Sequence, residues 1–77
     1  MENMRVNVVT SIKSDLMTTA EVGMEFGIPA GTLRYYRANG AGPASFRLAG
    51  RVRYRRSEVL AWIDAQERST RRGGVAV

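Results

Sequence analysis

Two hydrophobic periods follow one another along this chain of 77 residues. Over residues 18–38 apolar side chains recur every three or four positions, which is the spacing of helices that bury one face. Over residues 45–55 apolar and polar residues alternate, as they do in strands with one covered face. Helical spacing returns after Ser57. The pattern predicts a mainly α fold with a small β-hairpin: two helices, a two-stranded hairpin and a third helix.

Local signals set the ends of the first two helices. Thr18 and Glu21 have the spacing of a capping box, in which each side chain accepts a backbone N–H at a helix start. Gly27 suits the left-handed residue that ends a helix, and Pro29 suits the opening of the next one. We expect a second helix over residues 30–38, after a turn of about four residues, as in a helix-turn-helix motif.

Two helices that cross steeply need apolar or small residues where they touch. The sequence supplies such residues at every expected position of the motif. The inward positions are Val22, Phe26, Ile28, Leu33 and Tyr36, with Gly23 at the closest approach. Spacing alone also allows an ordinary helical hairpin that binds nothing.

The outward face of the second helix favours a nucleic-acid partner. Its N-terminal residues are small, and two arginines flank the exposed Tyr35, whereas a purely structural surface more often mixes Glu and Lys. In a helix-turn-helix complex, the N-terminal half of the second helix lies on base edges in the major groove. We therefore predict base contacts from Ala30, Gly31, Arg34 and Tyr35. We predict backbone contacts from Thr19, Thr32 and Arg37.

The alternating segment combines two short strands with strong positive charge, and Ala49-Gly50 is the predicted turn between them. The expected apolar face consists of Phe46, Leu48, Val52 and Tyr54. The expected opposite face carries Arg47, Arg51, Arg53 and Arg55, joined by Arg56. No acid lies between Ser45 and Ser57, so these cations have no partner nearby in sequence. A solvated charged face is one interpretation; the favoured one is a wing that lies on the DNA backbone or enters the minor groove.

The remaining segments complete the domain organisation. Ser57 is the expected N-cap of the last helix. The apolar face of that helix is expected to consist of Val59, Leu60, Trp62 and Ile63. Residues 1–15 are predicted to be a leader, in which Val6–Ile12 allows a short strand. Residues 16–67 form the predicted domain, and residues 68–77 a flexible basic tail.

Composition and charge narrow the function further. Eleven of the twelve cations are arginine, whose fork of donors suits phosphates and guanine edges, and the net charge is +5. Residues 1–29 hold two cations and four acids, net −2, whereas residues 30–77 hold ten arginines and three acids, net +7. A basic half of this kind usually binds a polyanion.

The absence of two residue types excludes most chemistry. Without cysteine and histidine, the chain lacks thiolate ligands, the usual zinc ligand and the usual general base. We therefore expect no enzyme activity, no metal, no cofactor and no small-molecule ligand. The longest apolar run, Val59–Ile63, is far shorter than the roughly 20 residues of a membrane span. We expect a cytoplasmic protein with no membrane partner.

The stretch TTAEVGMEFGIPAGTLRYYRANG, followed by FRLAGRVRYRRSEVLAWI, resembles the winged-helix domain shared by phage excisionases and MerR-type regulators. The resemblance covers roughly residues 17–66, and its most telling segments are 32–36 and 50–59. MerR-type regulators continue beyond the position of Arg68 into further helices and a coiled coil, which this sequence lacks. The resemblance therefore implies an excisionase, a small protein that binds and bends DNA and acts beside an integrase without catalysis.

The resemblance also assigns roles to individual positions. It places Arg34, Tyr35 and Arg37 on the recognition helix and the wing arginines on the DNA backbone. The expected function is to steer a phage integrase toward excision, with copies bound head to tail on tandem sites. A small MerR-like transcriptional regulator is the alternative within DNA binding. An RNA-binding module is disfavoured because Tyr35 is the one good stacking candidate, and a module that binds an acidic protein remains a further alternative.

Overall fold

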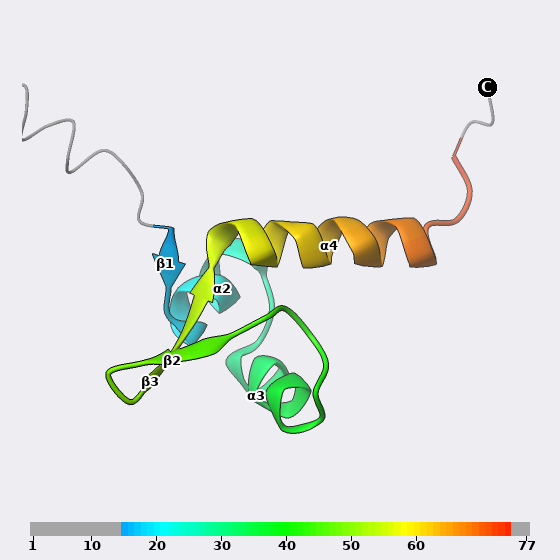
Figure 1. Ribbon diagram of the computed structural model, residues 1–77. Coiled ribbons are helices and arrows are strands. Elements are labelled where there is room, and N and C mark those ends of the chain that lie inside the picture. Colours follow the sequence, from blue (N-terminus) through cyan, green and yellow to red (C-terminus); the bar gives the residue numbers. More distant parts are fainter. Residues whose placement is uncertain (1–14, 75–77) are drawn as a thin grey trace, which may run out of the picture.

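The computed structural model describes residues 15–74, which contain three helices and three strands (Figure 1). In chain order these elements are β1 (Leu16–Met17), α2 (Thr19–Phe26), α3 (Ala30–Ala38), β2 (Phe46–Leu48), β3 (Arg51–Arg55) and α4 (Arg56–Thr70). The predicted fold class is confirmed: the chain is mainly helical, and its β-hairpin has the place of the wing in a winged helix-turn-helix domain.

The three strands form one antiparallel sheet in the order β1-β3-β2. Strand β1 was not predicted at this position; Leu16 pairs with Arg55 and Met17 with Tyr54. The strand that the sequence allowed at Val6–Ile12 lies outside the described residues. β1 makes β3 the central strand and joins the start of the domain to the wing.

The signals that begin and end α2 are confirmed. The Thr18 N–H donates to Glu21 Oε1 at 2.8 Å, and the Glu21 N–H donates to Thr18 Oγ1 at 3.0 Å, which completes the capping box. Gly27 ends the helix with φ 72°, in the left-handed region that favours glycine. A Cβ on Gly23 would lie 2.6 Å from the Ile28 carbonyl oxygen, so a side chain there would push the turn away from α2.

The core draws one or two side chains from most elements. Its members are at most 2% exposed: Met17, Val22, Leu33, Tyr54 and Val59. Four more apolar side chains are partly buried around them, namely Phe26, Ile28, Val52 and Ile63. The predicted inward positions Val22, Phe26, Ile28 and Leu33 are therefore confirmed, and β1, β3 and α4 supply the rest.

A second, smaller contact holds α4 against α3. The Trp62 and Tyr36 rings lie 5.8 Å apart between centroids at an angle of 57°, and both side chains are partly buried. This tilted aromatic pair sits at the edge of the core, so the prediction that Trp62 packs inward is correct. Leu60 differs from the prediction: it is 49% exposed and does not belong to the buried face.

The start of α4 also differs from the prediction. Ser57 is not the N-cap, because the helix begins at Arg56 directly after β3, with Arg55 in the N-cap position. The Arg56 N–H donates to the Asp15 carbonyl oxygen at 2.7 Å. The strand thus runs into the helix without a capping side chain, since pairing with the segment before β1 satisfies this donor.

Helix α4 continues to Thr70 and therefore includes the first three residues of the predicted tail. Arg68 pairs with Asp64 at 2.6 Å and Arg71 with Glu67 at 3.6 Å, each four residues apart. Its second half extends away from the rest of the domain (Figure 1). Within residues 15–74, no helix is long and apolar enough to cross a membrane.

Candidate nucleic-acid interface

The packing of α3 decides which of its residues face outward. Leu33 is fully buried and Tyr36 packs on Trp62, so these two side chains fix the rotation of the helix. Arg34 and Tyr35 lie on the opposite side; Arg34 is exposed, and Tyr35 is 65% exposed. Arg34 and Tyr35, the two long side chains among the predicted base contacts, are thus free to approach a ligand.

The N-terminus of α3 suits close approach to a phosphate or a base. Ala30, Gly31 and Thr32 make up its first turn, and Gly31 is exposed. The N-cap residue is Pro29, which has no polar side chain to bond the first N–H groups. These groups carry the positive end of the helix dipole, which favours an anion.

Arg37 lies three residues after Arg34 and next to it on the surface of α3, but on the side nearer the core. It is partly buried, and its Nη1 donates to Tyr54 Oη at 2.7 Å and to Thr19 Oγ1 at 3.2 Å. The structure therefore brings Arg37 and Thr19, both predicted backbone contacts, together in one hydrogen-bonded cluster. This cluster ties α3 to the start of α2 and to β3.

The pairing of the wing strands corrects one predicted face. Leu48 pairs with Arg51, Arg47 with Val52, and Phe46 with Arg53. Since paired residues of an antiparallel sheet point to the same side, Leu48 and Phe46 share a face with the β3 arginines. Arg47 lies on the face of Val52, where its Nη1 donates to the Gly50 carbonyl oxygen at 3.3 Å. The prediction of four arginines on one side and four apolar residues on the other is wrong.

Two cations near the wing have partners that lie far away in sequence. Arg55 pairs with Asp15 at 3.1 Å, and Arg56 pairs with Glu25. The absence of nearby acids in the sequence therefore did not leave these arginines unpaired. Among the described residues, Arg34 and Arg51 have no ion-pair partner, and both are exposed.

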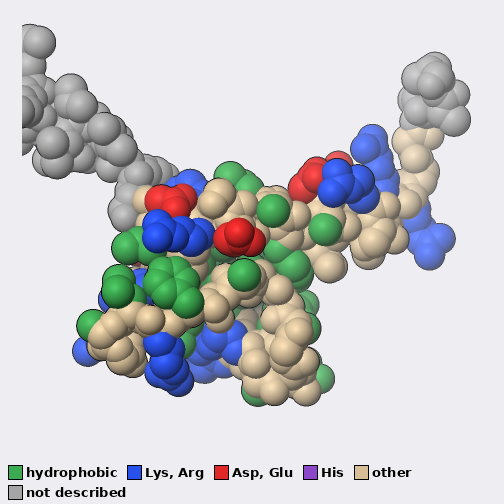
Figure 2. Space-filling view, viewed as in Figure 1, with side chains coloured by type: hydrophobic (Ala, Val, Ile, Leu, Met, Phe, Trp, Pro, Cys, Tyr) green, Lys and Arg blue, Asp and Glu red, His purple; other side chains and the backbone are tan. Residues whose placement is uncertain are grey.

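Arginines gather on the side of the molecule formed by the wing and α3. In Figure 2, the Lys and Arg side chains on the lower side of the domain, over the hairpin and beside α3, have no carboxylate next to them, whereas most of those higher up, toward α2 and α4, lie beside carboxylates. Separation of charge in this way orients a protein on a polyanion. The basic surface, defined by Arg34, Arg51 and Arg53 with Tyr35, is the candidate interface.

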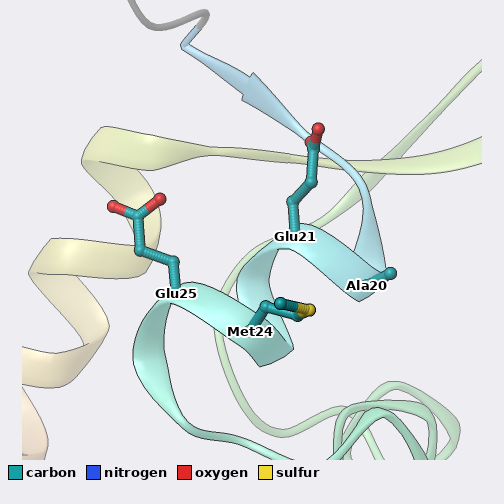
Figure 3. A pocket seen from close by; sticks show the side chains of 4 residues that line it. All are labelled: Ala20, Glu21, Met24 and Glu25. Carbon is teal, nitrogen blue, oxygen red and sulfur yellow. The ribbon is translucent and has the colours of Figure 1, made fainter.

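A shallow hollow on α2 has the opposite character (Figure 3). It is lined by Ala20, Glu21, Met24 and Glu25, all on one helix. Its two carboxylates have structural uses, since Glu21 completes the capping box and Glu25 pairs with Arg56. Negative charge repels DNA phosphates, so this side of α2 lies outside the candidate interface.

A helix-turn-helix with an exposed basic second helix, followed by an arginine-bearing hairpin, defines the winged helix-turn-helix class of DNA-binding proteins. The chain belongs to the helix-turn-helix domain family, whose model matches residues 16–67. That family includes excisionase-like DNA-binding proteins, and DNA is the partner that it implies here. No curated protein sequence matches this chain significantly.

Proposed function

We propose that the protein is an excisionase, which binds specific DNA sites, bends the DNA and steers a phage integrase toward excision. The observation that carries the proposal is that one copy forms a complete unit. In α4, Val59 and Ile63 pack on the core of the same copy. From Asp64 to Thr70 the helix carries alanine, polar and charged residues, with ion pairs along its own length. Over residues 15–74, α4 therefore offers no apolar seam for a two-fold dimer.

The contacts follow from the candidate interface. Arg34 and Tyr35 read base edges in the major groove, and Ala30 and Gly31 allow α3 to approach closely. Thr32 adds a phosphate contact at the helix start. The backbone contacts proposed for Thr19 and Arg37 require Arg37 to bind phosphate while it keeps its bond to Tyr54. The protein binds DNA in the bacterial cytoplasm and needs no cofactor to do so.

Copies without a two-fold axis bind neighbouring sites in one orientation, head to tail. The protein should then be a monomer in solution and protect tandem direct repeats on DNA. Sedimentation without DNA and footprinting with it measure both properties. A stable free dimer that protects an inverted repeat would contradict the proposal and favour a small MerR-like transcriptional regulator.

The decisive test is recombination in vitro with the integrase encoded nearest to this gene and its attachment sites. The full chain should raise the yield of excised product and lower the yield of integration. Arg34→Ala should abolish the effect, whereas Arg68→Ala is the matched control, because Arg68 is an exposed arginine on the distal part of α4. A yield of excised product that does not change at saturating concentrations of the protein would refute the excisionase role.

A further inference from the structure

The wing exposes two large apolar side chains on the face that carries its arginines. Leu48 is 45% exposed and Phe46 is 38% exposed. Neither belongs to the core or to the apolar residues packed around it, although Val52 and Tyr54 of the neighbouring strand do. Two large apolar side chains exposed on one basic face would be covered by a ligand that is both apolar and anionic.

The two residues have different surroundings. The Arg55 guanidinium lies over the Phe46 ring, 5.7 Å from its centroid, so Phe46 is held at the base of the wing. Leu48 is the last residue before the turn and pairs with Arg51, the first residue after it. At the tip of the wing, one face therefore presents a leucine beside an exposed arginine.

The turn itself keeps the tip narrow. Ala49 and Gly50 both have positive φ, 53° and 79°, which is the pattern of a type I′ turn. This turn reverses the chain in two residues, so the hairpin is no wider than two adjacent strands, about 4.8 Å apart. The minor groove of B-DNA is about 6 Å wide, little more than this spacing of the two backbones, so a hairpin tip that carries side chains enters only where the groove widens around it.

We propose that Leu48 is a wedge that inserts between base pairs in the minor groove and kinks the DNA. Proteins that bend DNA from this groove insert apolar side chains at a base step while neighbouring cations neutralise the phosphates. Leu48 supplies the apolar group, and Arg51 and Arg53 on the same face supply the charge. Base faces and flanking phosphates form the apolar and anionic ligand that this surface fits. The inference rests on the DNA-bending part of the proposed function and assigns that bending to one side chain.

A plainer role for Leu48 is to cover the aliphatic stem of its pair partner Arg51. The two roles differ in what they do to DNA. A covering leucine affects binding through the arginine and leaves the base pairs stacked. A wedge separates two base pairs, and it does so with any unbranched or γ-branched apolar side chain of similar length, such as methionine.

The test compares three variants of the full chain on one duplex that carries the binding site. End-to-end energy transfer between two dyes reports the bend, and 2-aminopurine placed in turn at steps under the wing reports unstacking. Leu48→Ala should lose most of the bend and the 2-aminopurine signal, with a loss of affinity below about tenfold, as for one contact among many. Leu48→Met should retain both signals. Leu60→Ala is the matched control, because Leu60 is a leucine of similar exposure, 49%, on α4.

The outcomes separate this inference from the excisionase proposal. A Leu48→Ala variant that bends and unstacks DNA like the parent would overturn the wedge, even if the parent promotes excision. Loss of bending in Leu48→Ala but also in Leu60→Ala would overturn it as well, since the effect would not belong to the wing. A parent that bends DNA through Leu48 but fails to promote excision would keep the wedge and refute the excisionase role. Circular dichroism confirms in each case that the variant is folded.

Discussion

The hydrogen bond between Arg37 and Tyr54 offers the sharpest test of what fixes α3, the proposed recognition helix, against β3. Tyr54 is fully buried, and its hydroxyl accepts from Arg37 Nη1 at 2.7 Å. Tyr54→Phe removes this hydroxyl and leaves the ring in the core. The bond involves a charged donor, for which a net contribution of about 1.5–3 kcal/mol is typical. Since Arg37 is only partly buried and keeps Thr19 as a partner, we expect the low end, a loss of about 1–2 kcal/mol in the free energy of unfolding.

The measurement is urea unfolding of the parent, of each single variant and of the double variant. Arg37→Met keeps the aliphatic stem and removes the donor. If the two groups interact directly, the single losses add to more than the double loss, with a coupling energy of about 0.5–1.5 kcal/mol. Tyr36→Phe is the matched control, because the Tyr36 ring is partly buried in an aromatic pair and, among the described residues, its hydroxyl makes no hydrogen bond. It should leave the free energy of unfolding within about 0.5 kcal/mol of the parent.

The same pair separates a structural role of Arg37 from its proposed phosphate contact. Tyr54→Phe retains the charge of Arg37, so the salt dependence of DNA binding should not change. Arg37→Met should reduce that slope by about one if Arg37 also neutralises a phosphate. A Tyr54→Phe variant as stable as the parent, or strictly additive losses, would show that the short contact contributes nothing and would refute this reasoning.

Three further predictions concern the recognition helix and the wing. Arg34→Ala should weaken binding to the specific site by about 1–3 kcal/mol and hardly affect random DNA, as titrations of both duplexes would show; equal losses would make Arg34 a phosphate contact. Replacing both Arg51 and Arg53 with alanine should weaken binding to all DNA alike and lower the salt slope by roughly one to two, and an unchanged slope would place the wing away from DNA. Ala49→Asn should stabilise the fold by about 0.5–1 kcal/mol, because φ 53° is costly for alanine and tolerated by asparagine at this turn position; thermal unfolding measures the gain, and a lower melting temperature would contradict it.

The parts of the fold that sequence predicts well are those fixed by residues close together in the chain. The capping box of Thr18 and Glu21, the end of α2 at Gly27 and the inward position of Leu33 each depend on a few neighbouring positions. Helical spacing then determines that Arg34 and Tyr35 lie on the side of α3 opposite Leu33 and Tyr36. For this reason, the recognition helix and its exposed residues were predictable before the structure was known.

The parts that sequence missed depend on contacts between distant segments. Arg55 and Arg56 find their acids at Asp15 and Glu25, and nothing in the local charge pattern indicates those partners. The start of α4 was misplaced for the same reason, since the Arg56 N–H bonds to the Asp15 carbonyl and the helix begins there, directly after β3, one residue before the expected N-cap Ser57. Arg37 was predicted as a surface residue because a sequence pattern cannot show that a buried tyrosine hydroxyl lies within reach.

The faces of the wing are a different case, because the sequence contained the information. Along β2 the apolar residues are even-numbered and along β3 the arginines are odd-numbered, so each strand alternates cleanly by itself. A two-residue turn at Ala49-Gly50 makes Leu48 the partner of Arg51, and this pairing puts the even positions of one strand beside the odd positions of the other. Four apolar residues share a face only if the turn has an odd number of residues, such as three. The predicted turn and the predicted apolar face were therefore incompatible, and the turn was correct. The two-residue turn leaves Leu48 among arginines at the tip of the wing, exposed on the face where it is proposed to contact DNA.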